Sequence, residues 1–223
     1  MNIKFEDAFN FTKWVFEKNG VSKKYSDICA DVLLSADELG FTTHGLSRLS
    51  YYIKRIKDGV IDANASPEII RDNKSCVTID GNNALGQVVA NYAMNQSIAK
   101  TQEHGISCVA VKNSSHYGIA SYYSRYATTK NLVGMSFTNA RPAVAPYEGV
   151  EPKMGTNPYA IAFPSDMDFP FSIDCATSVY QRGDLEVMAR KTPDSYVPNC
   201  AIVSENQNLT FERSLRWLKK GIA

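Results

Sequence analysis

The chain has 223 residues, of which 44% are hydrophobic and 21% are charged, a composition typical of a globular protein with a buried core. Its 24 Lys and Arg residues nearly balance its 23 Asp and Glu residues, and no basic block occurs, which argues against a nucleic-acid partner. The N-terminus carries acidic residues and no apolar signal segment, and no stretch approaches the ~18 apolar residues of a membrane span. We therefore expect a cytoplasmic protein that binds neither nucleic acid nor membrane.

The five cysteines are widely spaced and none forms a C-x-x-C pair, so we expect reduced thiols and no metal site. Cys76 and Cys108 lie in strand-like apolar runs, where the expected role is that of a small buried hydrophobic residue. Cys175, next to Asp174, is the one cysteine expected near a site.

The first third of the chain has the periodicity of helices, and three are predicted. The first runs from Phe5 toward Gly20, the second follows an N-cap at Ser22, and the third begins after Thr43 and ends at Gly59.

From Glu68 onward, strand patterns and helix patterns follow one another. The predicted elements are a hairpin of 68–70 with 76–80, a helix over 86–104, a strand over 106–111, a helix over about 119–130, and strands over 133–137, 159–163 and 171–174. Further helices are expected around Met188 and after Thr210. This mixture predicts an α/β (α+β) protein.

Two of the three histidines stand in settings that suit acid–base chemistry. The segment Thr43-His44-Gly45-Leu46-Ser47-Arg48 places an imidazole four residues before a guanidinium, so both are expected on one side of a first helical turn. An Arg fork matches a carboxylate, and a His titrating near ~6.5 can move a proton at neutral pH. His116 follows the predicted strand 106–111, where open α/β sheets commonly place ligands. The alternatives are a structural His116 and a solvated Arg48.

The usual nucleotide-binding signatures do not occur. The chain has neither a G-x-G-x-x-G dinucleotide fingerprint nor a P-loop, so any nucleotide must bind in another way. A long turn-rich loop leads to Gly155-Thr156-Asn157-Pro158, and such loops inside compact domains are usually functional, although these residues also suit an ordinary turn.

An ordered set of short motifs carries a family resemblance. The motifs are Ala36-Asp37-Glu38-Leu39-Gly40, Thr43-His44-Gly45-Leu46-Ser47-Arg48, Asp80-Gly81, Ser114-Ser115-His116-Tyr117-Gly118, Gly155-Thr156-Asn157-Pro158 and Ile173-Asp174-Cys175-Ala176-Thr177-Ser178. In this order and spacing they resemble the malate/L-lactate dehydrogenase family, which is unrelated to the Rossmann-fold malate and lactate dehydrogenases. The resemblance extends to about Arg190, and Gln181-Arg182-Gly183 with Glu186-Val187 is similar to the branch that contains malate dehydrogenases.

The resemblance implies a fold and an assembly. Residues 1–72 would form a helical domain on the substrate and dimer side, and residues 73–223 a three-layer dinucleotide-binding domain. Its sheet would be mixed and largely antiparallel, not a standard Rossmann fold. Complete family members continue well beyond the position of Ala223, so the chain is expected to lack the C-terminal part of this domain, and a homodimer is expected.

The resemblance also implies an NAD- or NADP-dependent oxidoreductase acting on a small 2-hydroxy or 2-oxo acid. His116 or His44 would be the acid or base, and Arg48 would hold the substrate carboxylate. The residues expected at the cofactor are Asn139, Ala140, Gly155, Thr156, Asn157, Asp174, Cys175 and Ala176. The alternatives are a truncated, catalytically inactive remnant or non-catalytic subunit of the family, and an unrelated carboxylate-binding module. The sequence does not decide which acid is the substrate, nor NAD against NADP.

Overall fold

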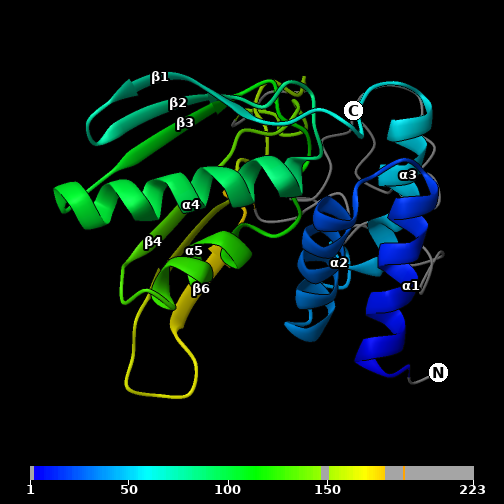
Figure 1. Ribbon diagram of the computed structural model, residues 1–223, viewed down its shortest axis with the longest axis horizontal. Coiled ribbons are helices and arrows are strands. Elements are labelled where there is room, and N and C mark those ends of the chain that lie inside the picture. Colours follow the sequence, from blue (N-terminus) through cyan, green and yellow to red (C-terminus); the bar gives the residue numbers. More distant parts are fainter. Residues whose placement is uncertain (1–2, 147–150, 179–187, 189–223) are drawn as a thin grey trace. The chain divides into compact units, whose positions relative to one another are not determined.

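The computed structural model describes residues 3–146, 151–178 and 188 (Figure 1). The predicted helix after Thr210 and the segments Gln181-Arg182-Gly183 and Glu186-Val187 lie outside the described residues. Of the helix predicted around Met188, only Met188 itself is described, and it is helical.

The first two predicted helices are confirmed and pack against each other. They are α1, Phe5–Lys18, and α2, Lys23–Glu38. The Ser22 hydroxyl accepts the backbone N–H of Tyr25 and so caps α2, as predicted. After α2 the chain turns at Gly40 with a φ of 83°, in the left-handed region that favours glycine.

The third predicted helix is divided in two. Its first turn is a 3-10 helix, η1, Leu46–Arg48, and the α-helix proper is α3, Leu49–Lys57. The backbone N–H of Leu46 donates to the Asp37 carboxylate at 2.8 Å, a tertiary bond at the first residue of η1 that local periodicity cannot reveal. Gly59 ends the helical region with a φ of 69°, as predicted.

A hydrophobic core joins these helices to the residues that follow. The buried members of this core are Phe16, Val21, Cys29, Leu33, Tyr52, Ile61, Ala63, Leu85 and Val88. Tyr52 is fully buried, with its ring 6.5 Å from the ring of Phe16. The helix that carries Arg48 in its N-cap is therefore anchored to the core through Tyr52, four residues later.

The predicted hairpin and crossover are confirmed as the first sheet, of order β1-β2-β3. Strands β1, Glu68–Asn73, and β2, Cys76–Asp80, are antiparallel and are joined by a two-residue turn at 74–75. Helix α4, Gly86–His104, then leads to β3, Cys108–Lys112, which runs parallel to β2. In Figure 1 the three strands lie along α4. Parallel neighbours need such a crossover connection.

The expected burial of Cys76 and Cys108 is wrong, because both side chains are exposed. Alternate residues of a strand point to opposite faces, and in β2 the buried positions are Val77 and Ile79, which pack with Ala93 of α4. Cys76 therefore belongs to the other face. Its register partner in β3 is Cys108, so the two exposed thiols stand on neighbouring strands.

The later elements are also close to the predicted ranges. They are α5, Ala120–Thr128, β4, Gly134–Phe137, β5, Tyr159–Phe163, and β6, Phe171–Cys175. The three strands form a second sheet of order β4-β5-β6.

Contacts divide the chain into two compact units. The first comprises Met1–Met135 with Ile161–Ser172, and the second comprises Ser136–Ala160 with Ile173–Ala223, so the division crosses the second sheet. The expected domain division between residues 72 and 73 stays a prediction. The fold class is confirmed as a mixture of helices and small sheets distinct from a standard Rossmann fold. None of the described helices has the length and apolar character that a membrane crossing requires.

Candidate active site

The segment that carries His44 and Arg48 is fixed on the end of α2. The carboxylate of Asp37, near the C-terminus of α2, accepts the backbone N–H of Leu46. Gly45 is buried beside it, and a Cβ atom at Gly45 would overlap this carboxylate. The absence of a side chain at Gly45 is therefore what allows Asp37 to hold the loop.

Within this loop Thr43 contacts both predicted site residues. The Thr43 hydroxyl lies 2.9 Å from His44 Nδ1, and Arg48 Nε donates to the Thr43 carbonyl oxygen at 2.6 Å. Within the described ranges the terminal amino groups of the Arg48 guanidinium take part in no hydrogen bond or ion pair. This end of the guanidinium can therefore accept a carboxylate.

The loop that carries His116 is fixed on the start of α4. The Ser115 hydroxyl accepts the backbone N–H of Gly86 at 2.8 Å and donates to the Ala84 carbonyl oxygen at 3.2 Å. A Cβ atom at Gly86 would overlap the backbone carbonyl oxygens of Ser115 and His116. His116 thus follows β3, as predicted, and its backbone is packed against the first residue of α4.

These two loops bring His44 and His116 together. The two imidazole rings are stacked, with centroids 5.6 Å apart and planes inclined by 21°. The Tyr52 hydroxyl lies 2.6 Å from His116 Nδ1, and the edge-on ring of Tyr51 lies 6.2 Å from the His116 ring. The three residues predicted as catalytic, His44, Arg48 and His116, therefore share one place in the first unit.

The hydrogen bonds of His116 assign its tautomer. The backbone N–H of Gly118 donates to Nδ1 at 3.3 Å, and a backbone N–H can only donate. Nδ1 is therefore the acceptor, the Tyr52 hydroxyl is a second donor to it, and the neutral ring carries its hydrogen on Nε2. Burial, which also raises the pKa of Tyr52, keeps that hydroxyl protonated.

His116 is neutral at physiological pH. The pKa of the ring is lowered from 6.5 to about 3, mainly by burial and to a smaller extent by the nearby charges of His44, Arg48 and Arg55. Perturbed pKa values of this kind occur at catalytic sites, where they set which group gives and which takes a proton.

The residues predicted at the cofactor lie in the second unit, where hydrogen bonds join their loops. The backbone N–H of Ala140 donates to the Asn157 side-chain oxygen at 3.0 Å. A Cβ atom at Gly155 would overlap the Ala140 carbonyl oxygen, so these two loops touch through their backbones. Both the N–H and the hydroxyl of Thr177 donate to the Thr156 carbonyl oxygen, at 2.9 and 3.0 Å.

The remaining predicted cofactor residues lie next to these bonds. Asn139 is exposed, while Asp174, Cys175 and Ala176 at the end of β6 are half-buried. A hydrogen bond with the Cys175 thiol raises the pKa of the Tyr159 hydroxyl. The structure therefore places all the predicted cofactor segments in one unit and joins three of their loops.

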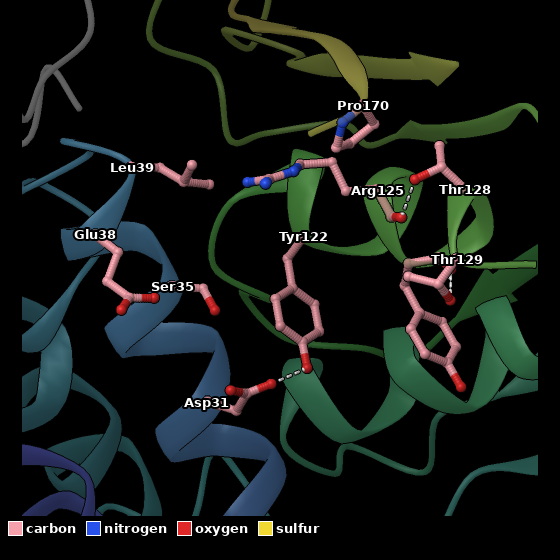
Figure 2. Close-up of a pocket in the computed structure, with 10 residues that line it drawn as sticks. Asp31, Ser35, Glu38, Leu39, Tyr122, Arg125, Thr128, Thr129 and Pro170 are labelled. Carbon is pink, nitrogen blue, oxygen red and sulfur yellow. Dashed lines mark hydrogen bonds between the residues drawn. The ribbon is translucent and has the colours of Figure 1, made fainter. Parts of the chain in front are cut away.

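A separate cavity of about 340 Å³ lies between α2 and α5 in the first unit (Figure 2). Its lining includes Asp31, Tyr122 and Arg125 and none of the predicted site residues. In Figure 2 the Tyr122 hydroxyl points at Asp31, to which it donates a hydrogen bond of 2.5 Å, and Arg125 extends toward Leu39. The Tyr122 bond fastens α5 to α2, a structural role.

Sequence reasoning missed Tyr52 and the role of Asp37. Tyr52 follows Arg48 by four residues in the predicted third helix, so the same-face rule that paired His44 with Arg48 could have included it. Asp37 lies within a quoted motif, but its bond to Leu46 depends on the turn after α2, which has no simple sequence signal.

An α/β scaffold that holds two stacked histidines beside an arginine defines a protein suited to binding a small acid and moving a proton. The chain matches the model of the family described as Malate/L-lactate dehydrogenase over residues 3–211, and it belongs to that family.

Named relatives agree with this assignment. Malate dehydrogenase of Pyrococcus horikoshii is 41% identical over 202 residues, which are 91% of this chain and 55% of the relative. L-sulfolactate dehydrogenase of Methanothermobacter thermautotrophicus is 39% identical over 210 residues, 94% of this chain and 61% of the relative. A crystal structure of malate dehydrogenase from Entamoeba histolytica has a TM-score of 0.93 and 36% identity, covering 99% of this chain and 62% of that one. The chain thus spans a little over half the length of such relatives.

Proposed function

We propose that the chain is an NAD- or NADP-dependent oxidoreductase that transfers hydride between the nicotinamide ring and a small 2-hydroxy or 2-oxo acid. The observation that carries this proposal is the neutral His116, stacked on His44 in the neighbourhood of Arg48. Family membership supports it, since relatives are named malate and sulfolactate dehydrogenases.

Arg48 would bind the carboxylate of the acid. Its Nε is held by the Thr43 carbonyl oxygen, which fixes the plane of the guanidinium and leaves its two terminal amino groups for a bidentate pair. A fixed carboxylate places the adjacent hydroxyl or oxo carbon at a defined distance from the stacked histidines. Such positioning is a major source of rate in two-substrate reactions.

His116 would act on the oxygen of the reacting carbon. Because Nδ1 accepts from Gly118 and Tyr52, Nε2–H is the group that can donate a hydrogen bond to a 2-oxo oxygen. Transfer of this proton to the alkoxide left by hydride addition would require a ring protonated beforehand, with the Tyr52 hydroxyl then accepting from Nδ1–H, so that the ring returns to its neutral form. The positive charge of Arg48 is one cause of the low pKa of His116. Because an anionic substrate would offset this charge, the pKa of His116 would rise when the acid binds. A positioned acid or base typically contributes ~10²- to 10⁴-fold in rate. His44, stacked on the same ring, is the second candidate for this role.

The second unit would hold the cofactor, which supplies the hydride acceptor or donor. Its loops would leave room for a flat ring, because Ala140 and Ala176, which stand at the predicted positions, are small and half-buried. Either nicotinamide dinucleotide fits these features. The homodimer and the cytoplasmic location stay predictions.

The test is a fluorescence titration of the purified chain with NADH and NADPH, followed by turnover assays with malate, lactate and their oxo acids. Saturable binding with turnover supports the proposal, and the preferred dinucleotide decides the cofactor. A folded chain without a saturable signal would be a non-catalytic member of the family. His116→Ala should lower kcat sharply in a folded protein, and near-normal kcat would remove His116 from the mechanism.

A further inference from the structure

Helix α3, which has Arg48 at its N-cap, carries a second guanidinium. Arg55 is in α3, and its Nε atom is buried with no hydrogen-bond partner among the described residues. Its guanidinium carbon lies 5.4 Å from the centre of the Tyr51 ring. Burying a charged hydrogen-bond donor without a partner costs free energy, so such a donor needs an explanation. One explanation is that a ligand supplies the missing partner.

Arg55 is connected to His116 through the Tyr51 ring, which contacts both side chains. The Tyr51 ring that packs against the guanidinium also meets the His116 ring edge-on, 6.2 Å away. Arg48 and Arg55 are seven residues apart, which is nearly two helical turns, so they lie on a similar face and roughly 10 Å apart along the axis. Both charges also lower the pKa of His116.

Among the described residues, no carboxylate forms an ion pair with the guanidinium group of Arg48 or of Arg55. Asp37, the carboxylate that organises the loop, accepts the Leu46 N–H. A ligand with two anionic groups would therefore find a cation for each, with the histidine pair nearby.

We propose that Arg55 is a specificity-determining residue that binds the second anionic group of a dianionic 2-hydroxy acid, while Arg48 binds the carboxylate next to the reacting carbon. This inference rests on the proposed function and narrows its substrate class. The second group is a carboxylate or sulfonate one or two carbons beyond the reacting carbon. An acid that ends in a methyl group, such as lactate, leaves Arg55 unpaired, and a site built for a polar group discriminates strongly against its apolar replacement.

The test compares Arg55→Gln with a matched control, Lys54→Gln. Both changes remove one positive charge from α3, but Lys54 is exposed and pairs with Asp58, so the control corrects for general electrostatics. The measurements are kcat/KM for malate and for lactate in the wild type and in both variants. Arg55→Gln should lower kcat/KM for malate roughly 10- to 100-fold, the cost of a lost charged hydrogen bond, and should change that for lactate by less than about twofold. Lys54→Gln should change neither by more than about twofold.

Other outcomes separate the two proposals. Equal losses for malate and lactate in Arg55→Gln, or no loss for either, would overturn the role of Arg55 and leave the proposed function standing. If the wild type turns over neither acid, the proposed function fails, and calorimetric titration with the same two acids then decides the inference alone. If the wild type binds malate more tightly than lactate and Arg55→Gln abolishes this preference, the role of Arg55 is supported. Equal affinities of the wild type for malate and lactate, or no binding of either acid, would overturn it.

Discussion

The low pKa of His116 makes the stability of the protein depend on pH in a way that one substitution should remove. In His116→Asn the side-chain oxygen takes the position of Nδ1 and can still accept from Tyr52, but the group never becomes charged. In the wild type the unfolded chain binds a proton below pH 6.5, whereas the folded chain does so only near pH 3. Stability contributed by this group is therefore lost as the pH falls from 6.5 toward 3.

The magnitude follows from the two pKa values. Each pH unit between them costs at most about 1.4 kcal/mol, and integration from pH 6.0 to 4.5 gives a loss of about 2 kcal/mol for the wild type relative to the variant. Other titrating groups are common to both proteins and cancel in the difference. The assay is urea unfolding of both proteins at the two pH values, with the free energies taken from linear extrapolation.

The quantity tested is the free energy of unfolding of the wild type minus that of the variant, compared at pH 6.0 and 4.5. A change in this quantity below about 0.5 kcal/mol would refute the reasoning, because the His116 ring would then titrate near its ordinary pKa in the folded protein. A direct check is available from NMR. The chain has only three histidines, so the His116 ring signal can be assigned by its absence from His116→Asn. That signal should not titrate between pH 7 and 5.

Tyr52→Phe keeps the aromatic ring in the core but removes a hydrogen-bond donor to His116, so it should lower the free energy of unfolding by about 1 kcal/mol. An unchanged urea midpoint would show that the bond is not formed. Exposed thiols react faster than buried ones, so a thiol reagent should label Cys76 and Cys108 in the folded protein well before Cys29, whose pKa is raised by burial. Peptide mass spectrometry that finds Cys29 labelled first would contradict the burial of Cys29 and the exposure of Cys76 and Cys108.

The sequence was a good guide wherever local signals agree with tertiary structure. Helix α4 has its predicted bounds, Gly86–His104, and the cap at Ser22 is formed as expected. The structure brings the motifs around His44 and His116 together, although the two histidines are far apart in the chain, and their role as one site stays a prediction. Strand order and loop closure brought them together, and the family resemblance anticipated this where periodicity alone could not.

The remaining features depend on contacts that no local pattern encodes. The bond between Tyr52 and His116 spans 64 residues, and the 3-10 turn at Leu46 follows from a side-chain acceptor on another helix. The exposure of Cys76 was wrongly predicted because a run of apolar residues does not say which face of a strand is covered. That face is decided by α4, through Val77 and Ile79.

The close packing of Gly86 against the loop of His116 limits which residues can replace Gly86 in related sequences. A side chain at this position would collide with the carbonyl oxygens of Ser115 and His116, so the first residue of α4 can change only if the loop takes another course. Glycine at position 86, thirty residues before the histidine, is thus a marker for whether that histidine is still held in the position that it has in this structure. Genomic sequences that keep the histidine but have lost this glycine can be sorted, before any assay, as candidates for altered chemistry.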